Sequence, residues 1–202
     1  MDVIRPDLQT RVDEASRGYQ LSVENILQRA FEMFRKAPAG FIIAGIVFLL
    51  AYSNPVTSLL LGGPLIAGFY IACALLKKGK DVDTGDFFRG FGKFLPLFLV
   101  HLLTSLIIAL GFILLVIPGI YFTTVYFFAH AFVWFYDVPV SEALRHSHRT
   151  VTGNFWQIFL ILLVVGLLNL LGAMAFGVGL LLTVPFGFCV IFAAFDDIIG
   201  IP

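Results

Sequence analysis

Three long stretches without a charged side chain constrain the fold of this chain more than any other feature. Residues 37–76, 94–136 and 150–195 contain no Asp, Glu, Lys or Arg. One membrane-spanning helix takes about 20 apolar residues, so each stretch is long enough for two spans and a tight turn. The bilayer core offers no water to backbone polar groups, and each stretch is therefore expected to fold as a helical hairpin.

Residues that favour turns lie near the middle of each stretch. They are Ser53-Asn54-Pro55 in the first, Ile117-Pro118-Gly119-Ile120 in the second and the segment 172–179 in the third. A helix does not continue readily through Pro118, and Gly119 allows the close turn that an apolar loop requires. The sequence therefore predicts an all-α polytopic membrane protein with six transmembrane helices paired as three hairpins. The predicted spans are roughly 39–52, 56–76, 95–117, 119–136, 154–174 and 178–195.

The placement of charge predicts the orientation. Charged residues make up 13% of the chain, against about 25% in soluble proteins, and the basic ones lie before the first hairpin or between hairpins. Loops rich in Lys and Arg stay in the cytoplasm, so we expect a multi-pass protein of a bacterial inner membrane with both termini inside. No removable signal peptide is predicted. Three re-entrant hairpins remain the alternative topology, because the far turns are short and apolar.

A short amphipathic segment precedes each hairpin. Apolar residues at helical spacing follow Ser22 and Ser141, which are candidate N-caps, and a third segment is centred on Phe87 and Phe91. Helices of this kind lie flat at the level of the lipid headgroups. We predict a polar N-terminal segment at 1–20 and a single transmembrane domain at 21–202, with candidate repeats at 22–76, 82–136 and 140–196.

A basic residue recurs near the end of each amphipathic segment, namely Arg35, Arg89 and Arg149. These residues are candidate ligands of anionic lipid headgroups, and simple anchoring at the interface is the alternative interpretation. Two prolines, Pro64 and Pro185, lie inside predicted spans. Each predicts a kink, because proline removes one hydrogen bond of the helix.

Two histidines, His101 and His130, lie inside the predicted third and fourth spans. At 1.5 Å per residue, each lies about 10 Å from the cytoplasmic end of its span, so the two rings are expected to face each other within one hairpin. Ionisable residues inside a membrane favour a proton relay or a ligand site. A structural hydrogen bond between helices is the alternative.

Other polar residues are candidates for the same region or for the interface. Asn169 in the fifth span, with Thr104 and Ser105 in the third, lines a polar path or makes packing hydrogen bonds. His146 and His148 lie two residues apart on a predicted helix and point to nearly opposite sides. They are therefore expected to face solvent or headgroups rather than share a metal ion.

Several function classes lack their sequence signals. The 13 basic and 13 acidic residues give no net charge, so nucleic acid is not an expected partner. The two cysteines, Cys73 and Cys189, form no disulfide framework or metal motif. The sequence contains no glycine-rich phosphate loop, no His-Glu-x-x-His and no Gly-x-Ser-x-Gly. We expect no catalytic residues, no cofactor and no metal site.

From Thr84 onward the order of motifs resembles a known group of proteins. The motifs are Gly-Asp-Phe-Phe-Arg-Gly-Phe at 85–91, Ile-Pro-Gly-Ile-Tyr at 117–121, Ser-Glu-Ala-Leu-Arg-His-Ser at 141–147 and Ala-Phe-Asp-Asp at 194–197. This order resembles uncharacterised bacterial six-span integral membrane families related to the membrane domain of some glycerophosphodiester phosphodiesterases. The resemblance implies a six-span fold of unassigned role. It transfers no activity, because the phosphodiesterase chemistry belongs to a soluble barrel that has no counterpart in this sequence.

Three function hypotheses follow from these observations. The first is a non-enzymatic module that organises membrane lipids or membrane partners. The partner is another membrane protein or, in a homo-oligomer, a second copy of this chain. The second is a channel or small-solute transporter that uses His101, His130 and the kinked helices. The third is an intramembrane enzyme, for which no nucleophile and base constellation is visible.

Overall fold

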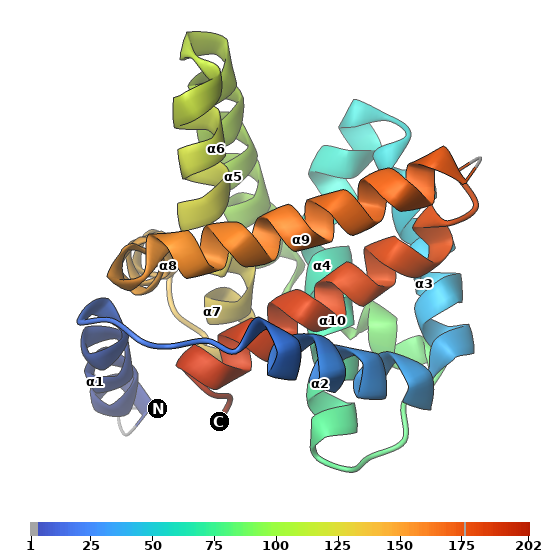
Figure 1. Ribbon diagram of the computed structural model, residues 1–202, viewed down its shortest axis with the longest axis horizontal. Helices are drawn as coiled ribbons and strands as arrows, with labels where there is room; N and C mark the ends of the chain where they lie inside the picture. Colours follow the sequence, from blue (N-terminus) through green and yellow to red (C-terminus); the bar gives the residue numbers. More distant parts are fainter. Residues whose placement is uncertain (1–3, 176) are drawn as a thin grey trace.

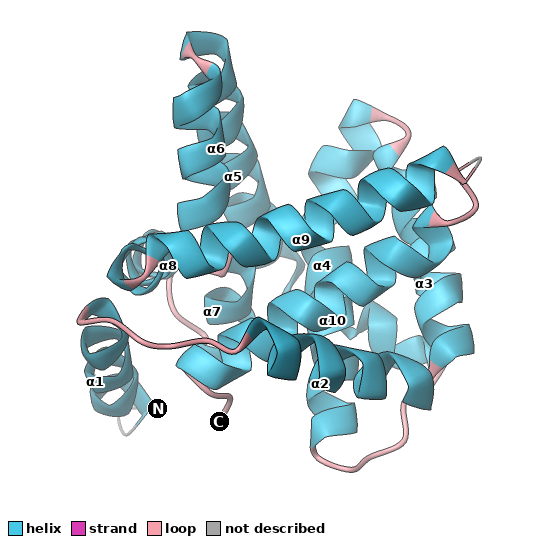
Figure 2. Cartoon of the chain, in the orientation of Figure 1, coloured by secondary structure: helices cyan, strands magenta, loops and turns pink. Residues whose placement is uncertain are grey.

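The structure is a computed structural model, and it describes residues 4–175 and 177–202 of the chain (Figure 1). Every regular element in these residues is a helix, as Figure 2 shows. In chain order they are α1 (Ile4–Ser16), α2 (Val23–Lys36), α3 (Pro38–Tyr52), α4 (Pro55–Lys77), the 3₁₀ helix η1 (Thr84–Lys93), α5 (Phe94–Leu114), α6 (Val116–Val125), α7 (Ala129–Tyr136), α8 (Val140–Gly153), α9 (Phe155–Met174) and α10 (Leu180–Ile198).

Five helical segments of the described chain are long and apolar enough to cross a membrane. They are Pro55–Lys77, Thr84–Leu114, Val116–Tyr136, Phe155–Met174 and Leu180–Ile198. A sixth span is reached only if α2 and α3 are counted together, although the two helices meet at an angle of 96°. The prediction of an all-α polytopic membrane protein is confirmed, with five spans or six if the bent pair is one of them.

The first hairpin turns where the sequence predicted. The helix α3 ends at Tyr52, and α4 begins at Pro55 after Asn54, whose side chain accepts a hydrogen bond from the Val56 N–H at 2.8 Å. Asparagine at the N-cap and proline in the first helical position are both locally stable choices. The third hairpin turns between Met174 and Leu180; residue 176, within the predicted turn 172–179, lies outside the described residues.

The predicted turn at 117–120 is wrong. The chain turns at Leu115, so Pro118 and Gly119 lie in the first turns of α6. Proline is tolerated there because the first N–H groups of a helix have no partner within it. Gly119 lies against Gly111 of α5. A Cβ added to Gly111 would lie 3.0 Å from the backbone of Gly119, so the two glycines let α5 and α6 pack closely.

A short helix precedes each hairpin, and the three helices differ in type: α2 and α8 are α-helices, and η1 is a 3₁₀ helix. Ser22 caps α2 by accepting a hydrogen bond from the Asn25 N–H, as predicted. The second segment is the 3₁₀ helix η1, which continues directly into α5. The proposed cap at Ser141 is wrong, because α8 already begins at Val140 and Pro139 occupies the N-cap position.

The helices α4 and α10 form the centre of the molecule. Of the apolar windows of the spans, 72% of the α4 window is buried inside the protein, against 28% for the Thr84–Leu114 segment and 22% for α9. Glycines let η1 lie directly on α4. A Cβ at Gly68 would overlap the Phe87 carbonyl, and one at Gly90 would overlap the Pro64 carbonyl. The buried thiols of Cys73 and Cys189 lie 3.5 Å apart where α4 meets α10.

The hairpin tips carry exposed apolar side chains. In Figure 1 the three tips point away from the region where α1 and the C-terminus lie. At the tip of the α5–α6 hairpin, every residue from Ile113 to Ile117 is exposed, with Ile113 at 78% and Ile117 at 79%. Surfaces of this composition are suited to contact with lipid or with another membrane protein.

The helix α1 packs on α8, although residues 1–20 were predicted only as a polar segment. Leu8, Val12 and Ala15 are buried in this contact region, and residues 1–3 lie outside the described part of the chain. An ion pair adds to the contact between α1 and α8, because Arg149 pairs with Asp13 at 2.7 Å. The domain boundary and the threefold repeat stay predictions.

Candidate functional site

His101 of α5 and His130 of α7 face each other, as the sequence spacing predicted. The Nδ1 atom of His101 lies 3.2 Å from the Nε2 atom of His130, within hydrogen-bond distance, and each residue is 7% exposed. Two neutral imidazoles form such a bond when one ring donates and the other accepts. The pair joins two spans of one hairpin inside the apolar region.

Glycines on α4 make room for this pair. An added Cβ at Gly62 would overlap the His101 Nε2 atom, and one at Gly63 would overlap the Leu97 carbonyl. The helix α5 therefore lies directly on the backbone of α4 at the level of the histidines. Larger side chains at Gly62 or Gly63 would push the two helices apart.

A cavity of about 170 Å³ adjoins the histidine pair between α4, α5, α6, α7 and α10. Its polar lining includes both imidazoles, Thr104 and the hydroxyls of Ser105 and Tyr126. The Thr104 hydroxyl already donates to carbonyls of its own helix, at Val100 and His101. Thr104 and Ser105, two of the three residues of the predicted polar path, thus lie beside the histidine pair.

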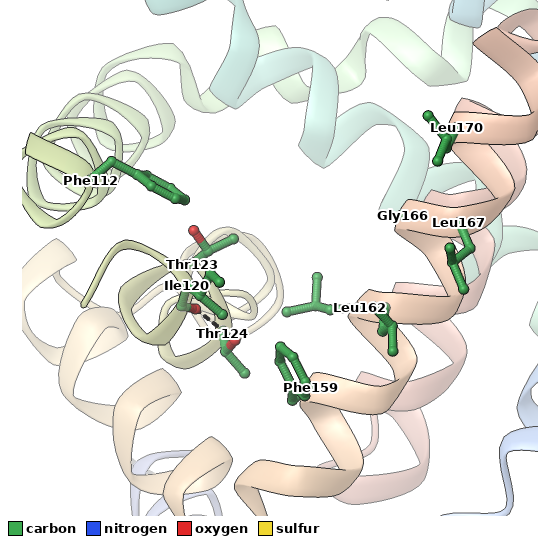
Figure 3. Close-up of a pocket in the computed structure, with 10 residues that line it drawn as sticks. Phe112, Ile120, Thr123, Thr124, Phe159, Leu162, Gly166, Leu167 and Leu170 are labelled. Atoms are coloured by element: carbon green, nitrogen blue, oxygen red, sulfur yellow. Dashed lines mark hydrogen bonds between the residues drawn. The ribbon is translucent and has the colours of Figure 1, made fainter. Parts of the chain in front are cut away.

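A second and larger hollow of about 390 Å³ lies between the α5–α6 hairpin and α9 (Figure 3). Phe112 and Ile120 line one side, and Phe159, Leu167 and Leu170 line the other, as Figure 3 shows. The two threonines in its wall turn their hydroxyls to their own helix, Thr123 to the Gly119 carbonyl and Thr124 to the Ile120 carbonyl, each at 2.8 Å. The wall of this hollow, called the apolar cleft below, is therefore almost wholly apolar.

Asn169 is not brought to the histidine pair. It lies on α9 opposite Gly187 of α10, and its Oδ1 atom is buried without a hydrogen-bond partner among the described residues. The rotation of α9 about its own axis decides which neighbour Asn169 meets, and the sequence does not encode that rotation locally. The predicted path through Asn169, Thr104 and Ser105 does not form a single site.

The predicted solvent or headgroup position is wrong for His146. The residue is 3% exposed and packs on Phe132, with 5.7 Å between ring centroids, because α8 lies between α1 and the α5–α7 region. Burial lowers the pKa of His146, and the nearby Arg145 charge lowers it further. His148 points elsewhere, with its Nε2 atom 3.1 Å from the Tyr121 hydroxyl.

The three candidate headgroup arginines have different surroundings. Arg89 pairs with Asp86 and Arg149 pairs with Asp13, each at 2.7 Å. Arg35 is exposed at the end of α2, with no carboxylate partner among the described residues. Its neighbour Lys36 lines a pocket of about 340 Å³ together with Lys80. Among the described residues, Arg35 is therefore the member of the trio without a carboxylate partner.

The candidate kink residues Pro64 and Pro185 both lie inside helices that continue on either side of them. Pro64 packs beneath Gly90 of η1, and Pro185 packs against Gly45 of α3. The structure thus places both prolines at helix contacts rather than at the histidine pair. A kink at either position stays a prediction.

Sequence reasoning missed Ser147, which supports a break in the fourth span. Residues 126–128 separate α6 from α7, and the Ser147 hydroxyl donates to the Val125 carbonyl at 2.8 Å and accepts from the Phe128 N–H at 3.2 Å. One signal was present in the sequence. Ser147 lies four residues after Ala143 and four before Val151, on the apolar face of its helix.

The fold and these hollows define a polytopic α-helical membrane protein with a cavity beside a histidine pair and an apolar cleft among its spans. Among the described residues, no group of three or more His, Cys, Asp or Glu side chains is placed to hold a metal ion. No protein-family model, no curated protein and no solved structure matches this chain. The family resemblance of the motifs after Thr84 therefore stays a prediction.

Proposed function

We propose that this protein is a non-enzymatic module of the bacterial inner membrane that binds lipid among its spans, with both termini in the cytoplasm. The observation that carries the proposal is the apolar cleft of about 390 Å³ between the α5–α6 hairpin and α9. Its walls belong to helices that are apolar enough to span the bilayer. A hydrocarbon chain is the ligand that the bilayer supplies to such a surface.

Charge at the cytoplasmic boundary supports the same proposal. Arg35 and Lys36 lie at the end of the amphipathic helix α2, and Lys80 lies nearby in the pocket that Lys36 lines. Basic residues at this level attract anionic headgroups by about 1 kcal/mol each. The exposed apolar tip of the α5–α6 hairpin offers a second surface, for a membrane protein partner or another copy of this chain.

Filling the cleft tests the proposal. Nothing lies within 4 Å of a Cβ built on Gly166, which lines the cleft, so the backbone there accepts a side chain and Gly166→Phe is expected to place its ring in the cleft. The matched control is Leu171→Phe, on the same helix at a 63% exposed position outside the cleft.

Native mass spectrometry of gently extracted protein is the readout. The wild type and Leu171→Phe are expected to retain lipid molecules that Gly166→Phe loses, because the ring occupies their place. Equal lipid retention in all three proteins would contradict the proposal. The same spectra report the oligomeric state.

A second candidate function is a path for protons or a small solute, supported by the hydrogen-bonded pair of His101 and His130 beside its own cavity. It predicts pH-dependent flux in liposomes that His101→Ala or His130→Ala alters. Liposomes that show no flux with the wild-type protein would contradict it.

A further inference from the structure

The apolar cleft and the histidine cavity share one wall. Thr123 of α6 lines both hollows, and its hydroxyl is bonded to the Gly119 carbonyl of its own helix. The two hollows therefore meet at Thr123, and a molecule in the cleft lies next to the histidine cavity. The cleft offers apolar contact, and the cavity offers hydrogen bonds.

The histidine pair keeps hydrogen-bonding capacity beyond its mutual bond. The contact uses Nδ1 of His101 and Nε2 of His130. The Nε2 atom of His101 lies against Gly62 and the Ser58 backbone of α4, which leaves Nδ1 of His130 as the ring nitrogen for a ligand. When Nε2 of His101 donates to the Ser58 carbonyl, its Nδ1 accepts from His130, and Nδ1 of His130 is then an acceptor for a hydroxyl donor. Among the described residues, the hydroxyls of Ser105 and Tyr126 in the same cavity have no hydrogen-bond partner within the protein.

The cavity contains no formal charge. The residues that line it include no Lys, Arg, Asp or Glu. A phosphate or carboxylate head placed there would lose its hydration without gaining a cation, which is a large cost in an apolar surrounding. An uncharged head with one hydrogen-bonding oxygen avoids this cost and matches the groups present.

We propose that the two hollows form one binding site for an uncharged single-chain lipid of the long-chain alcohol class. Its hydrocarbon chain lies in the apolar cleft, and its oxygen binds at the pair of His101 and His130. This inference rests on the proposed lipid-binding function and adds the chemical class of the ligand.

The test compares two probes with the same chain and different heads. They are a diazirine-bearing hexadecanol and the corresponding hexadecyl phosphate, added to the full-length protein in nanodiscs of phosphatidylcholine. On illumination, the alcohol is expected to label α6 and α9 peptides of the wild type at least about tenfold more than the phosphate, because only the uncharged head enters the cavity.

Two variants separate the head site from the chain site. His130→Leu is expected to reduce labelling by the alcohol to the level of the phosphate, while labelling by the phosphate stays unchanged. Ser105→Ala, at a half-buried position where the fold tolerates a smaller side chain, is expected to reduce labelling by the alcohol severalfold. Labelling by the alcohol that is unchanged in both variants would overturn the inference.

The failure of this inference is distinguishable from the failure of the proposed function. Equal labelling of the wild type by both probes, abolished by Gly166→Phe, would overturn the alcohol site and leave the lipid cleft standing. Labelling by both probes that Gly166→Phe does not reduce would overturn the proposed function as well.

Discussion

At the scale of single residues, Asp196 is the most constrained charge in the described chain. Its carboxylate side chain is 3% exposed and accepts hydrogen bonds from Arg29 of α2 and Lys77 of α4, each at 2.6 Å. The neighbouring Asp197 pairs with the other terminal nitrogen of Arg29. One buried carboxylate thus joins three helices at the boundary where the charges of the chain begin.

Asp196→Asn is expected to lower the free energy of unfolding by about 1–3 kcal/mol. The change leaves two cations facing a neutral amide, and the cost lies between those of exposed and fully buried pairs because Arg29 and Lys77 are partly exposed. Denaturant unfolding in detergent micelles measures the loss. The control is Asp137→Asn, which breaks a pair between Lys93 and an exposed carboxylate while keeping a residue that tolerates the left-handed backbone there. A loss in the control as large as in Asp196→Asn would contradict this account.

Residue pairs were predictable where chain spacing alone decides the geometry. His101 and His130 lie at equal depth in one hairpin, so arithmetic on the helical rise was sufficient to predict that they face each other. Asn169 and His146 were not predictable in this way. Their neighbours depend on how α9 and α8 rotate against other helices, and both residues lie on elements whose partners are distant in sequence.

At the scale of elements, the backbone groups left unpaired at the break in the fourth span find their hydrogen-bond partner on another helix. Residues 126–128 interrupt the helix, and the buried Ser147 of α8 binds both the Val125 carbonyl and the Phe128 N–H. Non-helical backbone at membrane depth is stable only when such groups find partners within the protein. The hydroxyl of Ser147 therefore holds α6, α7 and α8 together.

Ser147→Ala is expected to destabilise the protein by about 1–3 kcal/mol, because a buried N–H and a buried carbonyl lose their partner. The amides near Phe128 should also exchange hydrogen faster. Thr152→Ala on the same helix is the control, since that hydroxyl is exposed and bonds only to its own helix at His148 and Arg149. Unchanged stability and unchanged exchange in Ser147→Ala would show that the break has another support.

Elements were predictable where their signals are local. The turn at Ser53-Asn54-Pro55 follows from an N-cap and a proline that act within four residues. The break at 126–128 carries no glycine or proline, and the contact with Ser147 that supports it is not revealed by any pattern in the fourth span itself. The turn predicted at Pro118 was placed too late because proline fits equally well inside the first turn of the next helix.

At the scale of the whole molecule, the two chain ends and the charged loops are tied together on one side. Arg11 donates to the Ile199 carbonyl, Lys78 donates to the Pro202 carbonyl and Lys93 pairs with Asp137. In Figure 1 α1 and the C-terminal end of α10 lie on one side, and the hairpin tips spread away from them. This arrangement supports the proposal that both termini share the cytoplasmic side.

The first hairpin provides the sharpest test of topology. The helix α3 has 15 residues, a length of about 22 Å, and is shorter than the hydrocarbon core of about 30 Å. In a background of Cys73→Ala and Cys189→Ala, Ser53→Cys places one thiol at the exposed tip of this hairpin. A membrane-impermeant maleimide added to intact cells is expected to label it, because full crossing puts the tip outside.

The matched position is Asp81→Cys, in the exposed loop between α4 and η1, which is expected to react only after the cells are permeabilised. A re-entrant first hairpin would leave Ser53→Cys unlabelled in intact and in permeabilised cells, although detergent-solubilised protein reacts. Labelling of Asp81→Cys in intact cells would instead reverse the orientation. The first of these outcomes directly tests whether the bent pair α2–α3 is a sixth span. The other two hairpins are each built from segments long and apolar enough to cross the bilayer.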